Sequence, residues 1–280
     1  MKIKKLGAIA ATLAAVAAFA LAGCGNANSG SATSSSDSGS AATTSEAGYK
    51  LVKDGTLTVG TSAEYEPFEY MDNGEYAGFD LELIQKLAEK LDLKVEFKNV
   101  DFDSIVAGVS SGAKYDVGIA AITVTPDRKK EVDFTDAYYM DDQAIVTMKD
   151  NAEVTGDNYT EKLNADGFKI AVQSGSTAEA FAKENFPKAT LVPFKNATDC
   201  FAALQSNQAT ALVTNRSVAA QMVSDAYQNA QVIKQISTGE DYAIAVNKDN
   251  AKLKDDLNKA LKELTDDGTV DSLMAKYNIK

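Results

Sequence analysis

The feature that most constrains the fold is a regular alternation of apolar, strand-like segments with amphipathic segments after residue 56. Strands are expected at 57–61, 93–97, 116–120, 144–148, 168–172, 190–192, 210–213 and, as a last long strand, 242–246. Helices are expected at 80–90, 102–110, 176–185, 197–206, 218–227, 253–264 and 270–277. Strands that alternate with helices predict an α/β fold with largely parallel sheets, and the restart of the pattern at 168 predicts two similar lobes.

The first 23 residues have the pattern of a secretory signal peptide. Lys2, Lys4 and Lys5 give a positive start, residues 6–21 are apolar, and small residues precede Cys24. The apolar stretch is short for a membrane-spanning helix, which needs about 20 residues. The tetrapeptide Leu-Ala-Gly-Cys resembles the lipobox of bacterial lipoproteins. This resemblance implies cleavage before Cys24 and diacylglycerol on its thiol.

Residues 24–48 are predicted to be a lipidated cysteine and a disordered linker. From Asn26 to Gly48 almost every residue is Ser, Gly, Ala, Thr or Asn. Such a segment buries too little apolar surface to offset chain entropy, and it has the composition of a flexible tether. The remaining chain has about two domains' worth of length.

Charge and residue usage exclude several classes of function. Loss of the three N-terminal lysines takes the formal charge from −12 to −15, which argues against a nucleic-acid partner. The sequence contains no histidine, so histidine-dependent triads and ordinary zinc sites are excluded. It has no Walker-type loop and no G-x-G-x-x-G motif, and we predict no cofactor or metal. If Cys24 carries lipid, Cys200 has no disulfide partner and is expected to be a small buried hydrophobe.

Four segments carry a family resemblance that spans 57–277. They are 62–83, 116–139 with its Thr-Val-Thr-Pro-Asp-Arg run, 171–177 and 260–269. Together they resemble the bacterial extracellular solute-binding proteins of family 3, the lipoproteins that serve polar amino acid ABC transporters. The resemblance implies a two-lobe, type II periplasmic-binding-protein-like clamp with a cleft between the lobes. It implies lobe 1 at 49–140 and 242–280, lobe 2 at 141–241, and hinge crossings near 138–142 and 238–242.

The implied function is transport. A monomeric protein at the extracellular face of the membrane, or on the periplasmic side where there is an outer membrane, captures an amino acid or a similar small polar solute. It passes the solute to the permease and ATPase subunits of an ABC importer.

A buried amino acid needs a partner for its carboxylate and another for its ammonium, because unpaired buried charge is costly. Arg128 is the expected carboxylate ligand, since its guanidinium meets a carboxylate bidentately. Thr125 and Pro126 predict a helix start that would put Arg128 in the first turn. Thr123 can add a hydroxyl and an N–H, and Ala121 belongs to the same predicted ligand-binding segment.

The second lobe offers Gln173, Ser176 and Thr177. Family position suggests that Ser176 or Thr177 contacts the carboxylate and that Gln173 reads the ligand's side chain. Ser176 also begins a capping-box pattern that ends at Glu179, so its hydroxyl can equally cap the helix.

Tyr65 and Phe102 are expected to wall the aliphatic part of the ligand, with ordinary core packing as the alternative. Phe68, Phe79, Phe134 and Tyr139 are expected to be core.

The sequence departs from the family pattern at the residues expected to bind the ligand's ammonium group. The family usually has an aspartate where this chain has Asn215, and an amide does not neutralise an ammonium. Ser62 stands where several relatives carry another aspartate, and Glu64 is the nearby substitute.

Two other functions compete with transport. An exported dehydratase-type enzyme on the same fold needs a carboxylic acid in the cleft, for which Glu64 and Asp103 are the candidates. A ligand-sensing receptor is the second. We predict that the chain is not an enzyme.

Overall fold

The computed structural model describes residues 43–44 and 48–279. The predicted signal peptide, Cys24 and nearly all of the predicted linker lie outside the described residues. The chain divides into Met1–Ser38 and Gly39–Lys280, and every described residue belongs to the second unit.

The first lobe is built on a five-stranded sheet of order β7-β3-β8-β15-β9. Its strands are β3 (Thr56–Thr61), β7 (Lys94–Asn99), β8 (Val117–Gly118), β9 (Asp133–Phe134) and β15 (Ala245–Val246). Its helices are α1 (Phe79–Lys90), the 3-10 turn η1 (Phe102–Ser104), α2 (Ile105–Ser110), α3 (Arg128–Glu131), the 3-10 turn η2 (Lys248–Asn250), α8 (Ala251–Asp266) and α9 (Thr269–Lys276). The helix α1 buries its apolar face against β7, α8 and α9.

The second lobe is built on a sheet of order β12-β11-β13-β10-β14. Its strands are β10 (Tyr139–Met148), β11 (Lys169–Gln173), β12 (Thr190–Phe194), β13 (Ala211–Asn215) and β14 (Ala230–Tyr242). Its helices are α4 (Tyr159–Leu163), α5 (Thr177–Asn185), α6 (Ala197–Gln205) and α7 (Arg216–Asp225). The helices α5 and α6 pack against β11, and α7 packs against β10 and β13.

Two small sheets complete the described part of the chain. One has three antiparallel strands, β4 (Glu64–Tyr65), β5 (Glu69–Asp72) and β6 (Glu75–Ala77). The other pairs β1 (Thr43–Thr44) with β2 (Lys50–Leu51), so two residues predicted to be disordered linker form a short strand.

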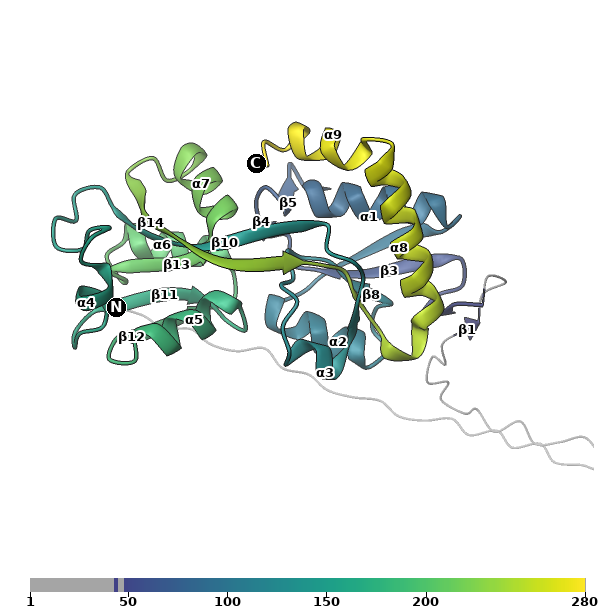
Figure 1. The fold of residues 1–280 in the computed structure, drawn as a ribbon, viewed down its shortest axis with the longest axis horizontal. Helices are drawn as coiled ribbons and strands as arrows, with labels where there is room; N and C mark the ends of the chain where they lie inside the picture. The colour runs from purple at the N-terminus through teal and green to yellow at the C-terminus, as the bar shows by residue number, and fades with distance from the viewer. Residues whose placement is uncertain (1–42, 45–47, 280) are drawn as a thin grey trace, which may run out of the picture. The chain divides into compact units, whose positions relative to one another are not determined.

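The long strands β10 and β14 connect the lobes. They run antiparallel and side by side, and Figure 1 shows them extending from the second lobe toward the first. Their register is irregular between Asp141 and Gln143, where the partner changes from Glu240 to Ile236. The side chain of Asp142 accepts hydrogen bonds from the N–H groups of residues 238 and 239 at this irregularity.

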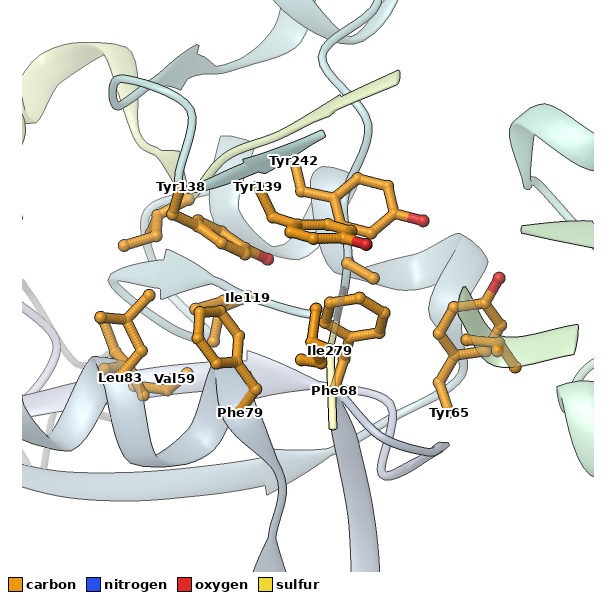
Figure 2. Close-up of a cluster of buried hydrophobic side chains, with 14 of the residues drawn as sticks. Val59, Tyr65, Phe68, Phe79, Leu83, Ile119, Tyr138, Tyr139, Tyr242 and Ile279 are labelled. Atoms are coloured by element: carbon orange, nitrogen blue, oxygen red, sulfur yellow. The ribbon is translucent and has the colours of Figure 1, made fainter. Parts of the chain in front are cut away.

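An aromatic cluster fixes the ends of β10 and β14 on the first lobe. Tyr139 pairs with Tyr242 in the sheet register, and both rings lie 5.3 Å from the ring of Phe68. Figure 2 shows Tyr138, Tyr139 and Tyr242 in one row opposite Phe79 and Phe68. All five side chains are buried.

Most predicted elements are present near their expected positions, and the buried Cys200 is confirmed. Two expectations about the main sheets are wrong. The sheets are mixed, because β15 is antiparallel to β8 and β9, and β10 is antiparallel to β13 and β14. The last long strand is β14, which ends at Tyr242 where the predicted strand began; β15 has two residues. The polar residues of β14 obscured its strand pattern.

No helix within the described residues combines the length and hydropathy needed to cross a bilayer.

Two buried carboxyl groups, those of Asp80 and Glu69, lie in the first lobe. Asp80 Oδ2 accepts hydrogen bonds from the Ala121 N–H and the Tyr138 hydroxyl, both at 2.7 Å. Burial nevertheless raises the pKa of Asp80 to about 7. Burial, and then the charge of Asp80, raise the pKa of Glu69 well above its usual value. Neither oxygen of Glu69 has a hydrogen-bond partner among the described residues.

These raised pKa values predict a fall in stability with increasing pH. A carboxyl group with a raised pKa in the folded state contributes stability below its unfolded pKa, near 4, and loses it as pH rises through the folded value. We expect Glu69→Gln to match the wild type in free energy of unfolding at pH 4 and to exceed it by ~1–3 kcal/mol at pH 8. Urea unfolding at both pH values measures this. The exposed Glu75→Gln is the control, and equal pH profiles for Glu69→Gln and wild type would contradict the assignment.

Candidate functional site

The candidate site lies where segments of both lobes meet around the carboxylate of Glu240. Thr123 follows β8 in the first lobe, whereas Thr177 begins α5 and Asn215 ends β13 in the second. Glu240 Oε2 accepts hydrogen bonds from the Thr123 hydroxyl at 2.7 Å and the Thr177 hydroxyl at 2.6 Å. The Asn215 amide donates to the same oxygen at 3.2 Å. Thr123, Thr177 and Asn215 were predicted from the sequence. They meet at Glu240, which was not predicted.

Glu240 and Gln143 are the residues that sequence reasoning missed. Glu240 Oε1 accepts hydrogen bonds from the Gln143 amide and, at 3.2 Å, from the Thr238 hydroxyl. The available signal was indirect: Asn215 leaves a position without the family's usual negative charge, so another carboxylate could have been sought. Glu240 was overlooked because its strand was not predicted.

Arg128 links the lobes. Its Nη1 donates to the Thr123 carbonyl at 2.7 Å, and its Nη2 donates to the Gly175 carbonyl at 3.0 Å. The guanidinium carbon lies 5.3 Å from the centre of the Phe102 ring, a cation–π geometry. Burial lowers the pKa of Arg128, and the negative charge of Glu240 opposes that change.

The local sequence explains how Arg128 is held. The Thr125 hydroxyl oxygen accepts a hydrogen bond from the Arg128 N–H at 3.2 Å, as a helix cap does. The expected helix start at Pro126 is wrong by two residues, because Pro126 and Asp127 form a turn and α3 begins at Arg128.

Tyr65 packs in the apolar core and also contacts a residue of the site. Its ring belongs to the main apolar cluster, and its hydroxyl donates to Asn215 Oδ1 at 2.8 Å and lies 3.1 Å from the Thr214 hydroxyl. Burial raises the pKa of Tyr65, which keeps the hydroxyl protonated as a donor. Asn215 is thus oriented with its oxygen toward Tyr65 and its NH₂ group toward Glu240.

Ala121 is held by the buried Asp80. Its backbone adopts φ 46°, a left-handed conformation that is strained for a side chain other than glycine. The hydrogen bond from its N–H to Asp80 stabilises this conformation and fixes the segment that leads to Thr123.

Ser62 and Glu64 lie on the first lobe at the contact with α6. Ser62 is buried, and its carbonyl accepts a hydrogen bond from the Glu64 N–H at 2.7 Å. The Glu64 carboxylate accepts a hydrogen bond from the Thr198 hydroxyl of the second lobe at 2.8 Å. Neither residue is among the hydrogen-bond partners of Glu240 in the described part of the chain.

Ser176 and Gln173 make contacts within the second lobe. The Ser176 hydroxyl accepts from the Glu179 N–H at 3.1 Å and donates to the Gln173 carbonyl at 2.7 Å, so it caps α5. Glu179 reaches back to the Gly175 N–H at 2.7 Å. The Gln173 amide donates to the Lys195 carbonyl at 3.2 Å. Of the two uses left open for Ser176, the structure contains the cap.

A pocket of about 250 Å³ opens beside the guanidinium of Arg128. Phe102, Asp103, Val106 and Gly175 are among its lining residues. Its wall combines the Arg128 guanidinium and the Phe102 ring with three acidic residues, Asp103, Asp127 and Glu131, so it presents both signs of charge.

Residues 57–280 match the bacterial extracellular solute-binding proteins, family 3. The chain belongs to this family. The arginine-binding extracellular protein ArtP of Bacillus subtilis (strain 168) is 34% identical over 272 residues, which cover 95% of each chain. The ABC transporter glutamine-binding protein GlnH of the same organism is 31% identical, and the match covers 73% of this chain and 74% of GlnH.

Solved structures agree with this assignment. An ancestral arginine-binding protein bound to arginine is 40% identical with a TM-score of 0.75, covering 80% of this chain and 98% of that one. The ancestral amino acid-binding protein AncCDT-1, a precursor of cyclohexadienyl dehydratase, is also 40% identical, with a TM-score of 0.74 over 80% of this chain and 95% of its own. The predicted two-lobe, type II clamp fold is confirmed.

Proposed function

We propose that this extracellular solute-binding protein captures a free amino acid between its lobes and delivers it to the permease and ATPase of an ABC importer. The observation that carries the proposal is Arg128. Its half-buried guanidinium borders the pocket and takes part in none of the ion pairs that the described residues form. A planar guanidinium binds a carboxylate through two parallel hydrogen bonds. The names of relatives that bind arginine and glutamine support an amino acid as the solute.

Each predicted site residue has a role in this proposal. Arg128 binds the ligand's carboxylate, and Thr123 and Thr177 add hydroxyl groups from the two lobes. Phe102 and Tyr65 wall the aliphatic part. The remaining predicted residues shape the site around these contacts: Ser62, Glu64, Ala121, Gln173, Ser176 and Asn215.

The proposal includes a hinge. The lobes touch through the Arg128–Gly175, Glu64–Thr198 and Tyr65–Asn215 hydrogen bonds, so the described arrangement is a closed clamp. The irregular pairing of β10 with β14 at Asp142 lies within the predicted crossings, and a break in strand pairing eases bending there. Lobe boundaries at 140/141 and 241/242 remain part of the proposal.

The proposal also includes export and anchoring. The N-terminal pattern and the Cys24 motif support cleavage after residue 23 and lipidation, which would tether a monomer to the outer face of the cell membrane.

Finally, we infer that the chain is not an enzyme. Many relatives are named as binding proteins. Of the two candidate acids, Glu64 accepts a hydrogen bond from Thr198 in the contact between lobes, and Asp103 is exposed to solvent. Asp103 nevertheless lines the pocket, so this inference rests on the relatives rather than on the position of the acids.

The first test is a thermal-shift screen of the twenty common L-amino acids and L-cystine, followed by calorimetry on the best binder. Arg128→Ala should weaken its binding by ~2–5 kcal/mol, because the ligand's carboxylate loses its charged partner. The control Lys129→Ala removes the adjacent exposed charge and should change little. Wild-type affinity in Arg128→Ala would refute the site.

Closure predicts a second result. A Cβ atom on Gly175 would lie 2.8 Å from the Asp103 Cβ of the first lobe, so Gly175→Ala should hold the lobes apart and weaken binding at least ~5-fold. Gly167→Ala is the matched control, because it has a similar positive φ and open space around its Cβ. Solution scattering with the bound amino acid should give a larger radius of gyration for Gly175→Ala alone. Equal radii and affinities for the two variants would argue against closure across this contact.

Anchoring predicts a third result. In a bacterial host, Cys24→Ser should abolish partitioning into the detergent phase, because no thiol remains for the lipid. Cys200→Ser should leave partitioning unchanged, since this thiol is buried. Detergent-phase recovery of Cys24→Ser equal to wild type would remove the lipoprotein proposal.

A further inference from the structure

Glu240 is a buried carboxylate surrounded by neutral donors. It is 6% exposed. Its hydrogen-bond donors are all uncharged: Thr123, Gln143, Thr177, Asn215 and Thr238. It takes part in none of the ion pairs that the described residues form within 4.0 Å. A cation in contact with a buried carboxylate stabilises it strongly, and the described residues supply no such cation.

Arg128 and Glu240 carry opposite charges, and each forms a hydrogen bond with Thr123. Arg128 donates to the backbone carbonyl of Thr123, and Glu240 accepts from the hydroxyl of the same threonine, each at 2.7 Å. Neither side chain is in an ion pair with the other. A guanidinium and a carboxylate held apart across Thr123 complement the two ends of a zwitterion.

Asn215 cannot serve as the ammonium acceptor in its observed orientation. Its oxygen is occupied by the Tyr65 hydroxyl, and it turns an NH₂ group toward the site. An NH₂ group is a donor and would face the donors of an ammonium. Asn215 instead donates to Glu240 and helps to hold that carboxylate in place.

We propose that Glu240 is the anionic residue that binds the ammonium group of the ligand. This inference rests on the proposed capture of an amino acid and adds the partner that the sequence lacked at position 215. Glu240 Oε2 already accepts three hydrogen bonds, so the ammonium would replace one of these neutral donors, the hydroxyl of Thr123 or Thr177 or the amide of Asn215. An α-amino acid would therefore bridge Arg128 and Glu240, and a carboxylic acid without an ammonium would leave Glu240 unpaired.

If Glu240 binds the ammonium, moving the negative charge from position 240 to position 215 should restore part of the affinity. Asn215→Asp alone would bring a second carboxylate next to Glu240, and like charges at hydrogen-bond distance repel. In a Glu240→Gln background the same change restores one negative charge. The double variant should therefore bind better than Glu240→Gln.

The test uses the mature protein and the tightest binder among the twenty common L-amino acids and L-cystine. Its partner probe is the same molecule with hydrogen in place of the α-ammonium. By calorimetry, Glu240→Gln should lose at least ~30-fold in affinity for the amino acid and no more than about threefold for the deaminated probe. The double variant Glu240→Gln/Asn215→Asp should recover at least ~5-fold. The matched control Asp241→Asn removes the adjacent exposed charge and should bind as wild type does.

Melting of each ligand-free variant checks that it folds, and the ratio of the two probes is independent of the fraction folded. Equal losses of affinity for both probes would show that Glu240 only holds the lobes together, and this result would overturn the proposal. Wild-type affinity in Glu240→Gln would overturn it as well. Should the wild type bind no amino acid in the set, the proposed function fails first and this inference falls with it.

Discussion

The pairing of β10 with β14 is the constraint on which the rest of the site depends. The Tyr139–Tyr242 pair and Phe68 fix one end of the ribbon on the first lobe, while its length belongs to the sheet of the second. Because side chains alternate along a strand, Glu240 and Tyr242 face inward and Asp241 faces solvent. A shift of this register by one residue would turn Glu240 out of the site, so the aromatic packing determines where the carboxylate lies.

The site holds two opposite charges, the half-buried Arg128 and the buried Glu240. Arg128 and Glu240 are both removed from much of the solvent, and each is held by neutral groups. Hydrogen bonds of this kind stabilise an ion less than an opposite charge does. The arrangement is therefore best satisfied by a molecule that carries both charges. The same contacts span the two lobes, so such a molecule would also favour the closed clamp.

The sequence predicted the parts that depend on local patterns. The helices α1, α5 and α8 follow from apolar spacing, and the contact of the Thr125 hydroxyl with the Arg128 N–H follows from the Thr-x-Thr-Pro-x-Arg run. It could not predict contacts between residues far apart in the chain, such as Thr123 with Glu240 or Tyr65 with Asn215. The strand β14 was missed because most of its residues are polar or exposed, which leaves little apolar alternation. Ser176 illustrates this limit, because the sequence alone does not distinguish a serine that caps a helix from one that contacts a ligand.

The most direct measurement is a crystal structure of the mature protein with the amino acid that it binds. The account predicts density for the ligand between the lobes, with its carboxylate within hydrogen-bond distance of the Arg128 guanidinium and its ammonium against Glu240. A ligand bound outside the contact between the lobes, or one whose carboxylate points away from Arg128, would contradict the account.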